Sequence, residues 1–365
     1  MRTLTLVAPG DLLTATGGYE YDRRVLEGLQ DLGWAARVLS LDSSFPTPSV
    51  EALRDAHWQL ATLPAGSLVM IDGLALGAMP DIVHAHKDRL CMVGLVHHPL
   101  AAETGLTPDL VAQLFESERR ALGAMRHVVV TSQSTQRALT AYGVASDRIA
   151  VVEPGVDLPA ITQLQAEERL YDATAPVRML CVATITPRKG HDLLVHALSS
   201  LRNLSWTLTC VGNTQRSPAT ARALSMQIEA LKLENRIVLT GEIDEAGLHR
   251  DFRSADLFVL ATHFEGYGMA VAQALAHGLP IVSTRTGAIE ALVPTDAGLL
   301  VEPGNGTALR DALSQVLADP NLRQSLAAGA RVAGSGLASW SAASQRLSAV
   351  LAGVAHTIGE CRALR

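Results

Sequence analysis

The sequence predicts two doubly wound α/β domains joined by a polar linker. Short apolar runs rich in β-branched residues alternate with longer segments of helical period. The chain has 365 residues and an apolar content of 48%, which is enough for two buried cores. The alternation stops at 158–176, a stretch rich in Ala, Glu and Asp, and then resumes. This break predicts the linker.

The predicted elements follow one another in β–α order. In the first half the predicted strands are 3–8, 36–41, 68–72, 91–98, 128–132 and 149–157, and the predicted helices are 21–33, 49–63, 76–86, 109–127 and 134–143. In the second half the strands are 178–185, 206–213, 236–241, 256–262, 280–284 and 297–301, with helices at 191–202, 218–233, 245–255, 269–278 and 340–364. This rhythm predicts parallel sheets, whose ligands bind beyond the carboxyl ends of the strands.

Composition excludes several classes of function. The formal net charge of -6 and the absence of a Lys and Arg cluster argue against nucleic acid as a partner. No apolar run reaches the roughly 18 residues that a membrane helix requires, which leaves only attachment to a membrane surface open. The four cysteines are far apart and form no CxxC or zinc-type spacing. We therefore expect reduced thiols, no metal site and a cytoplasmic protein.

The stretch "LFVLATHFEGYGMAVAQALAHGLPIVS" places an acid, Glu265, in a glycine-rich turn between a predicted strand and a predicted helix. It lacks the third glycine of a dinucleotide fingerprint, since Val271 stands there, and the next strand ends at Thr284 without an acid for a ribose. What remains is a helix N-terminus that suits an anionic ligand such as a diphosphate. Met269 and Gln273 share one face of this helix. A Glu265 that merely caps the helix is the alternative.

A second strand–turn–helix, "ATITPRKGHDLLVHAL", places Arg188 and Lys189 at the carboxyl end of a strand. Such a cationic pair can neutralise phosphate oxygens where no metal is available. Two solvated charges on a surface turn are the alternative. Because the chain contains no Asp-x-Asp, a divalent metal clamped between carboxylates has no evident ligands.

In the first half, Gly17 and Gly18 precede a predicted helix, where the backbone can approach a ligand or form a flexible loop. His97 and His98 end a predicted strand. A strand-end histidine can bind a sugar hydroxyl or transfer a proton. Adjacent residues of an extended chain point in opposite directions, so we expect at most one of the two histidines to be functional.

Taken in order, these segments resemble the GT-B glycosyltransferases of family 4, a retaining group. The resemblance covers nearly the whole chain and rests on Gly17 and Gly18, His97, "VVEPGVD", "TPRKG", "VGN", "LTGEI", the stretch from 255 to 284, "GLLVEPGN" and the Trp340 region. It implies an acceptor-binding Rossmann-like domain at 1–165, a donor-binding Rossmann-like domain at 166–339, and a helix at 340–365 that crosses back to the first domain.

The resemblance also implies roles for individual residues. Glu265 is similar to the first acid of the E-x7-E signature, which contacts the donor sugar, and His97 to the histidine near the transferred sugar. These two are the expected catalytic residues. The residues expected to bind the donor are Gly17, Gly18, Arg188, Lys189, Ile243, Gly266, Tyr267, Gly268, Met269, Ala270 and Gln273.

Two positions depart from the family pattern. Gln273 replaces the second acid of the signature, which is expected to bind the ribose, and the Arg often found before the Lys is replaced around Thr184. A glutamine can still bind a ribose through its carbonyl and amide groups, without a charge-assisted bond.

The expected function is metal-independent, retaining transfer of a hexose from a nucleoside diphosphate sugar to an acceptor hydroxyl, without a cofactor. The acceptor is a saccharide, a lipid-linked alcohol or a small molecule. A glycoside hydrolase is disfavoured, because it needs two carboxylates and only Glu265 is a good candidate. The alternatives are a non-catalytic nucleotide-sugar binding subunit, a sugar-nucleotide epimerase and a glycoside phosphorylase.

Overall fold

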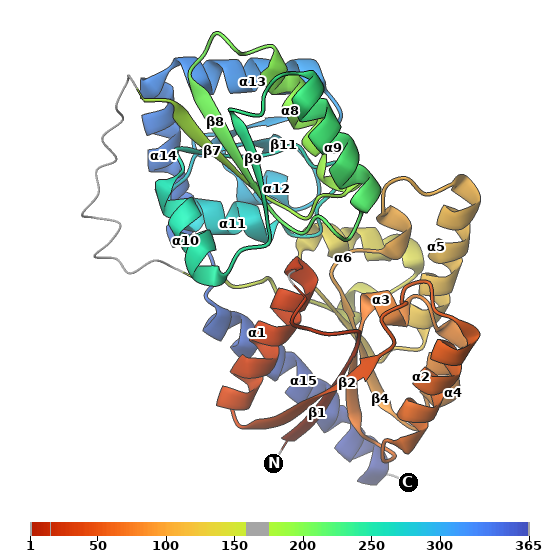
Figure 1. Cartoon of the computed structure of the whole chain (residues 1–365). Coiled ribbons are helices and arrows are strands. Elements are labelled where there is room, and N and C mark those ends of the chain that lie inside the picture. The colour runs from red at the N-terminus through yellow and green to blue at the C-terminus, as the bar shows by residue number, and fades with distance from the viewer. Residues whose placement is uncertain (1, 15, 158–174, 364–365) are drawn as a thin grey trace. The chain divides into compact units, whose positions relative to one another are not determined.

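The computed structural model describes the backbone of residues 2–14, 16–157 and 175–363, with side chains to residue 356 (Figure 1). The chain divides into two compact units. The first unit comprises Met1–Gly155 and Ala338–Arg365, and the second comprises Val156–Leu337. The predicted boundary at 165/166 lies outside the described residues, and the later division falls two residues before the predicted one at 339/340.

The first unit contains a six-stranded parallel sheet in the order β2-β1-β3-β4-β5-β6. Its strands are β1 (Arg2–Pro9), β2 (Trp34–Leu41), β3 (Leu68–Asp72), β4 (Cys91–Val96), β5 (His127–Val130) and β6 (Ile149–Val151). β3 and β4 are buried along their whole length, as expected for strands covered on both faces. The strand order reverses between β1 and β3, which marks the ligand-binding edge of such a sheet.

Helices cover both faces of the first sheet. α1 (Gly17–Asp31) packs against the long C-terminal helix α15 (Trp340–Ala363), and the two lie side by side in Figure 1. The other helices of this unit are α2 (Val50–Thr62), α3 (Gly73–Leu76), α4 (Pro80–His86), α5 (Pro108–Gly123) and α6 (Gln133–Leu139), with short 3₁₀ turns η1 (Leu100–Ala102), η2 (Thr140–Tyr142) and η3 (Ser146–Arg148). α2, α4 and α5 contact one another in turn.

The second unit contains another six-stranded parallel sheet, in the order β12-β11-β10-β7-β8-β9. Its strands are β7 (Val177–Val182), β8 (Trp206–Val211), β9 (Ile237–Gly241), β10 (Leu257–Leu260), β11 (Ile281–Thr284) and β12 (Gly298–Val301). The order reverses between β7 and β10. The carboxyl ends of these two neighbouring strands therefore form the expected ligand-binding edge.

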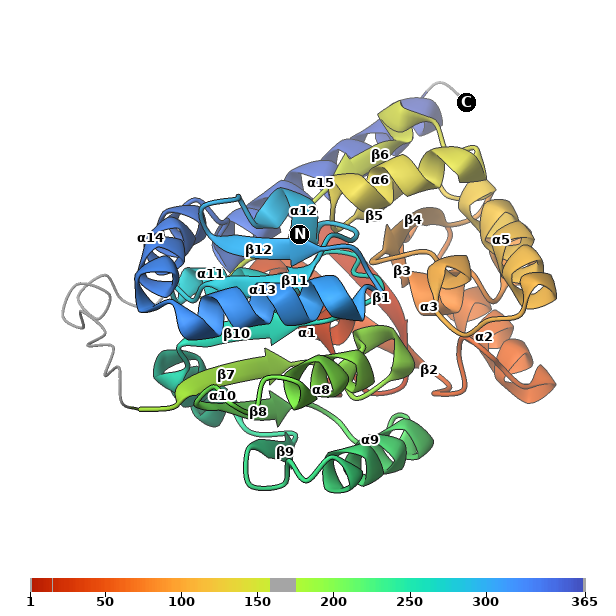
Figure 2. The same ribbon diagram turned by 90° about the horizontal axis from the view of Figure 1, so that it is seen from above.

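The helices of the second unit lie on both faces of this sheet (Figure 2). They are α8 (His191–Ser199), α9 (Pro218–Ala230), α10 (Glu245–Ser254), α11 (Met269–Ala276), α12 (Ile289–Leu292), α13 (Gly306–Ala318) and α14 (Pro320–Ser335), with the 3₁₀ turn η4 (Pro187–Lys189). No element was predicted from the sequence at α12, α13 or α14. α13 packs on α8 and on the strands β11 and β12, and α14 packs on α11.

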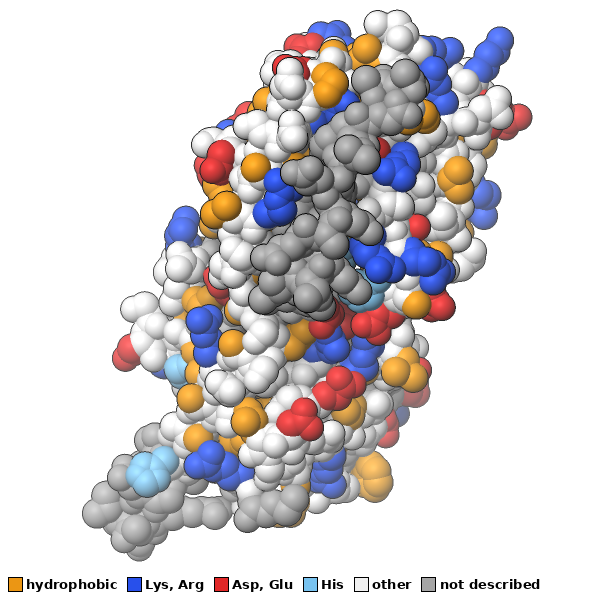
Figure 3. Space-filling model, turned by 90° about the vertical axis from the view of Figure 1, so that its left-hand side faces the viewer, with side chains coloured by type: hydrophobic (Ala, Val, Ile, Leu, Met, Phe, Trp, Pro, Cys, Tyr) orange, Lys and Arg blue, Asp and Glu red, His pale blue; other side chains and the backbone are white. Residues whose placement is uncertain are grey.

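Basic and acidic side chains are interspersed on the surface shown in Figure 3. Within the described part of the chain, no helix has the length and apolar character needed to cross a bilayer.

Candidate functional site

The candidate site of the second unit lies where the strand order reverses. β7 leads through the turn η4 into α8, and β10 leads through residues 261–268 into α11. Because β7 and β10 are parallel neighbours, the two turns that follow them come together at one edge of the sheet. This register brings Lys189 and Glu265 into contact, although 76 positions separate them in the sequence.

Glu265 lies between two cations. Lys189 Nζ donates a hydrogen bond to Glu265 Oε1. Arg188 Nη1 lies 3.8 Å from the same oxygen and donates to the Phe264 carbonyl oxygen at 2.7 Å. The side chains of Arg188, Lys189 and Glu265 are 16%, 16% and 10% exposed, so solvent screens these charges only weakly. The structure thus brings together three of the residues predicted for the site.

This environment keeps Glu265 ionised. Burial by itself raises the pKa of the carboxyl, but the charges of Lys189 and Arg188, with hydrogen bonds from Lys189 and Thr262, outweigh burial and lower it. An ionised carboxylate accepts hydrogen bonds and cannot donate a proton. Glu265 is therefore suited to accept hydrogen bonds from hydroxyl or amide groups of a ligand, and it is unsuited to act as a general acid.

Thr262, which was not among the residues predicted from the sequence, supports the turn. Its hydroxyl is fully buried and lies 3.1 Å from the Arg188 carbonyl oxygen and 3.0 Å from that of Phe264. The His263 N–H also donates to the Arg188 carbonyl, at 2.7 Å. These contacts hold the two turns together through their backbones. Its place directly after an apolar strand is the feature of the sequence that could have indicated this role.

A close backbone approach fixes the position of the cationic turn. Gly190 ends η4 with a φ of +64°, and a Cβ atom there would lie 2.1 Å from the Ala261 carbonyl oxygen. Any other residue would separate the two turns or strain the backbone. Gly287 likewise lies against Glu265, since its Cβ would be 1.7 Å from the Glu265 carbonyl oxygen.

α11 begins directly after Glu265. Gly268 precedes it with a φ of +96°, and Met269 and Ala270 form its first turn, half-buried. The early N–H groups of a helix and its dipole favour an anion at this end. Gly266 is also half-buried, whereas Tyr267 is 7% exposed and packs in a small apolar cluster of this unit.

Gln273 makes a contact that the sequence did not predict. Its Nε2 donates to the Asp157 carbonyl oxygen at 3.0 Å, and its Oε1 accepts from the Asp157 N–H at 3.3 Å. Both ends of the amide are thus engaged by the segment that enters the second unit. The expected ribose contact stays a prediction. Ile243, the residue predicted near the base, is half-buried in the loop between β9 and α10.

In the first unit, His97 follows β4 and lies against two buried acids. His97 Nε2 is 3.1 Å from Asp22 Oδ1 and 3.5 Å from Asp72 Oδ2. Asp22 is on the buried face of α1, and Asp72 ends β3 and caps α3. The ring of Tyr21 meets the imidazole edge-on, with a centroid distance of 5.3 Å. The predicted catalytic histidine is therefore part of a three-residue titratable cluster.

The cluster has perturbed pKa values. Burial lowers the pKa of His97, but the charge and hydrogen bond of Asp22 and the charge of Asp72 outweigh it, so the pKa is raised. Burial and the charge of Asp22 raise the pKa of Asp72 to about 7, against opposing effects of His97 and of two backbone N–H groups. Neither acid was among the residues predicted from the sequence. Two features of the sequence could have indicated them. Asp22 falls on the apolar face of an amphipathic helix, and Asp72 ends an apolar strand.

The two glycines at the start of α1 have different surroundings. Gly17 is exposed, and Gly18 lies so close to His97 that a Cβ would be 3.2 Å from its Cδ2 atom. Thr16 caps this helix by accepting from the Tyr19 N–H. Because Gly18 has no side chain, the His97 ring fits beside the start of α1. Donor binding by either glycine stays a prediction. His98 faces elsewhere, with Nε2 3.7 Å from Glu103 Oε2.

Comparisons with known proteins agree with this architecture. Among curated relatives, a D-inositol 3-phosphate glycosyltransferase of Xylanimonas cellulosilytica is 29% identical over 243 residues, which is 64% of this chain, and one of Thermomonospora curvata is 26% identical over 275 residues, which is 71%. The matches span 58% and 64% of the relatives' own length, less than two thirds.

Solved structures match over the whole fold. A sucrose-phosphate synthase from Thermosynechococcus elongatus has a TM-score of 0.81 at 19% identity, covering 97% of this chain and 99% of the other. The HepE protein of Anabaena, in complex with UDP and glucose, has a TM-score of 0.74 at 16% identity, covering 96% and 99%. At these identities the likeness establishes the GT-B fold alone, as the sequence predicted.

Family models match each half of the chain. The model described as Glycosyltransferase Family 4 covers residues 21–159, and the model described as Glycosyl transferases group 1 covers residues 176–319. The two matches follow the two sheets, and with the fold they confirm the resemblance seen in the sequence. This chain belongs to the group 1, family 4 glycosyltransferases of GT-B fold.

Proposed function

We propose that this protein is a retaining glycosyltransferase that moves a hexose-type sugar from a nucleoside diphosphate sugar to an acceptor hydroxyl without a metal ion. The observation that carries the proposal is the Arg188–Lys189–Glu265 arrangement at the edge where the second sheet reverses its order. It combines two cations for a diphosphate with one ionised acceptor for sugar hydroxyls, beside the N-terminus of α11.

In the proposed reaction the bond between the anomeric carbon and the diphosphate oxygen breaks, and a bond to the acceptor oxygen forms on the same face of the sugar. The acceptor proton passes to the departing phosphate. Arg188 and Lys189 stabilise the negative charge that develops on the leaving diphosphate. Lys189 has three N–H donors, so it can keep its bond to Glu265 and still bind a phosphate oxygen. Glu265 orients the sugar.

The relatives guide the choice of substrates to test. HepE structures have been determined with UDP and with UDP-glucose, so uridine nucleotides are the first donors to examine. Curated relatives carry the name D-inositol 3-phosphate glycosyltransferase, which makes a polyhydroxylated small molecule a reasonable first acceptor beside saccharides and lipid-linked alcohols.

Calorimetric titration with UDP, GDP, ADP, dTDP and their hexose conjugates, with and without EDTA, tests the donor site. We expect one nucleotide family to bind, with no effect of EDTA and with weaker binding in Lys189→Ala and Glu265→Ala. Arg222→Ala, an exposed substitution on α9, is the matched control and is expected to bind normally. Loss of binding in EDTA would contradict the metal-independent proposal.

Turnover and stereochemistry are tested separately. With the donor identified, the anomeric configuration of the product is read by NMR, and retention is expected. An inverted product would overturn the same-face mechanism. Donor binding with no transfer to any acceptor class would favour a non-catalytic binding subunit, and turnover without an acceptor would favour an epimerase.

A further inference from the structure

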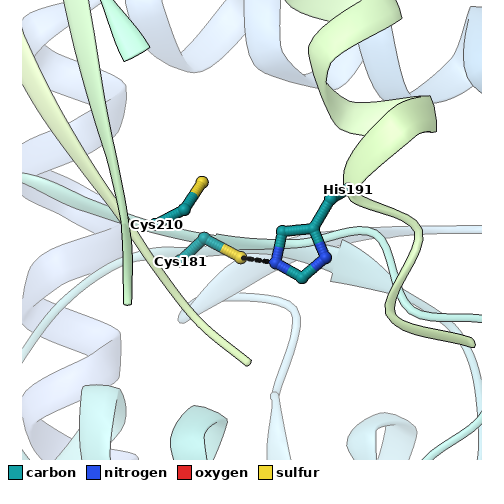
Figure 4. A group of neighbouring side chains, drawn as sticks. All are labelled: Cys181, His191 and Cys210. Atoms are coloured by element: carbon teal, nitrogen blue, oxygen red, sulfur yellow. Dashed lines mark hydrogen bonds between the residues drawn. The ribbon is translucent and has the colours of Figure 1, made fainter. Parts of the chain in front are cut away.

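A cluster of two cysteines and a histidine lies in the core of the second unit, outside the site described above (Figure 4). Cys181 of β7 and Cys210 of β8 are direct partners in the register of the sheet. His191 is the first residue of α8. The three residues are 0%, 2% and 3% exposed. Figure 4 shows the Cys181 sulfur and the His191 ring directed toward each other, and Sγ and Nε2 are 3.7 Å apart.

We propose that Cys181, Cys210 and His191 bind one thiophilic metal ion, with Zn²⁺ the best-matched ion, as a structural clip beneath the cationic turn. The inference is independent of the proposed transferase activity. It concerns an ion that holds the fold, and no step of sugar transfer uses it.

The spacing of the ligand atoms fits such an ion. Bond lengths of about 2.3 Å to sulfur and about 2.0 Å to nitrogen at tetrahedral angles place the ligand atoms about 3.6–3.8 Å apart. The Cys181–His191 distance of 3.7 Å already has this value, and all three ligand atoms lie within 4.8 Å of one another. A contraction of at most about 1 Å, within reach of small side-chain rotations, would complete the site.

The charge and the softness of the two thiolates favour Zn²⁺ over other ions. Two thiolates and one Zn²⁺ sum to zero, so the loaded cluster would carry no net charge into an apolar core, where an unbalanced charge is costly. Soft sulfur ligands favour zinc or Cu(I) over Ca²⁺ and Mg²⁺, which require oxygen ligands. Cu(I) would leave a net negative charge. Three protein ligands leave the fourth tetrahedral position for a water molecule.

The neighbouring groups are consistent with a metal-binding role for the cluster. The ligand atom of His191 is Nε2, which faces Cys181 Sγ, whereas Nδ1 is buried on the other side of the ring and has no hydrogen-bond partner among the described residues. The cluster around His97 differs, because two of its three residues are acids with oxygen ligands, which a thiophilic ion does not prefer.

A bound ion would stabilise the second unit by joining two points of the chain. Cys181 and His191 lie at the two ends of the segment 181–191, which contains η4 with Arg188 and Lys189. An ion that joins these ends closes the segment into a short loop and limits its conformations, as a crosslink does. We therefore expect the metal to raise the melting temperature of the second unit.

The test uses the full chain with Cys361→Ser, which leaves Cys91, Cys181 and Cys210 as its thiols. The protein is stripped with a chelator, kept reduced, and titrated with Co²⁺ and then Zn²⁺. We expect one equivalent of Co²⁺ to give thiolate-to-cobalt charge-transfer absorption and intense tetrahedral d–d bands, both lost when Zn²⁺ displaces it. The melting temperature should rise with either ion.

Substitutions assign the ligands. Cys181→Ser and Cys210→Ser should each remove most of the charge-transfer absorption, and His191→Asn should weaken binding and alter the d–d bands. Cys91→Ser, a buried cysteine of the first unit, is the matched control and should bind normally. A full signal in both Cys181→Ser and Cys210→Ser, or a loss in Cys91→Ser, would overturn the assignment.

X-ray absorption of the unsubstituted protein provides a measurement that needs no variant. A zinc shell with two sulfur and one or two nitrogen or oxygen neighbours is expected. A shell without sulfur, or no charge-transfer absorption at stoichiometric Co²⁺, would overturn the proposal even if every ligand substitution prevents folding.

Discussion

The side-chain amide of Gln273 pairs with the backbone of Asp157 through both of its polar atoms. Nε2 donates to the Asp157 carbonyl oxygen at 3.0 Å, and Oε1 accepts from the Asp157 N–H at 3.3 Å. Only an amide can do both, because a carboxylate has no N–H to donate. The residue that departs from the family signature therefore fastens the incoming segment of the second unit to α11.

Gln273→Glu tests this contact. The substitution restores the acid of the signature, but it places a carboxylate oxygen against the Asp157 carbonyl oxygen and loses one hydrogen bond. We expect the free energy of unfolding of the second unit to fall by about 1–2 kcal/mol. Chemical denaturation measures the change. Gln345→Glu, an exposed residue of α15, is the control and should have little effect. Equal stability of Gln273→Glu and the unsubstituted chain would show that the pairing contributes nothing.

The Lys189–Glu265 pair should contribute to stability in a pH-dependent way. Lys189→Met leaves the buried carboxylate with Arg188 as its remaining cation, and we expect a cost of about 2–4 kcal/mol at neutral pH. Because the folded-state pKa of Glu265 is lowered, its contribution is present above its usual value of 4.5 and is lost as the pH falls through the folded-state pKa. Denaturation of Lys189→Met, Glu265→Gln and the double variant at several pH values measures the coupling.

The exposed pair Arg285–Glu290 is the control for this cycle. Its side chains are 44% and 62% exposed, and its coupling should be at most about 0.5 kcal/mol. A coupling for Lys189 and Glu265 that is equally small, or that does not weaken in acid, would rule out a strong buried pair.

Gly190→Ala should damage the cationic turn more than its backbone strain alone explains. A left-handed alanine costs about 1–2 kcal/mol, and the added Cβ would also lie 2.1 Å from the Ala261 carbonyl oxygen. Gly241→Ala in the same unit has a similar φ of +72° and nothing within 4 Å of the added atom, so it isolates the strain. We expect Gly190→Ala to lower the melting temperature further and to weaken donor binding, and Gly241→Ala to leave donor affinity unchanged. Similar losses in both variants would mean that the close approach is unimportant.

The first unit should lose stability as the pH rises. The folded-state pKa values of His97 and Asp72 are both raised, so the folded state binds more protons than the unfolded state. Stability from this source is present at low pH and is lost as the pH rises through the folded-state values. We expect Asp72 to cause a decline between about pH 4 and pH 7, and His97 to add to it above its ordinary value of 6.5, with at most about 1.4 kcal/mol per pH unit for each extra proton.

Urea denaturation followed by tryptophan fluorescence measures this dependence. Asp72→Asn removes one titrating group and keeps the cap of α3, since an asparagine oxygen can accept from the Leu74 N–H. The decline should be shallower in this variant and unchanged in Asp81→Asn, an exposed control. A stability that rises with pH across this range would contradict the direction assigned to both groups.

Much of the architecture was accessible from the sequence. β-branched runs such as 68–72 and 128–132 predicted strands because central parallel strands are buried on both faces and carry little else. The helix at the chain end was also predicted, and α15 begins at the expected residue, Trp340. The predicted linker at 158–176 lies almost wholly outside the described residues. The helices α13 and α14 were missed, although Asn305 and Asp319 cap them and Pro320 opens the second. Such capping residues are typical of helix N-termini and could have predicted both helices.

Only part of the candidate site could be predicted from the sequence. Glu265 and Lys189 were predicted because each follows a strand at the edge where such sheets bind ligands, and the structure places them in contact. Asp22, Asp72 and Thr262 were not, since a single polar residue in an apolar segment does not reveal its partner. The hydrogen bonds between Gln273 and the Asp157 backbone were also not predicted, because they join a helix to a segment 116 positions away in the sequence.

The sequence by itself determined the two α/β units, the order of their elements and the family, because hydrophobic periodicity and turn residues are local properties of the chain. The tertiary structure alone decided which side chains meet. Cys181 and Cys210 are 29 positions apart and form no metal-binding spacing, yet the register of β7 and β8 makes them neighbours. Lys189 meets Glu265 because β7 and β10 are adjacent at the point where the order reverses. Such contacts depend on strand order and register, which arise from the packing of the whole sheet.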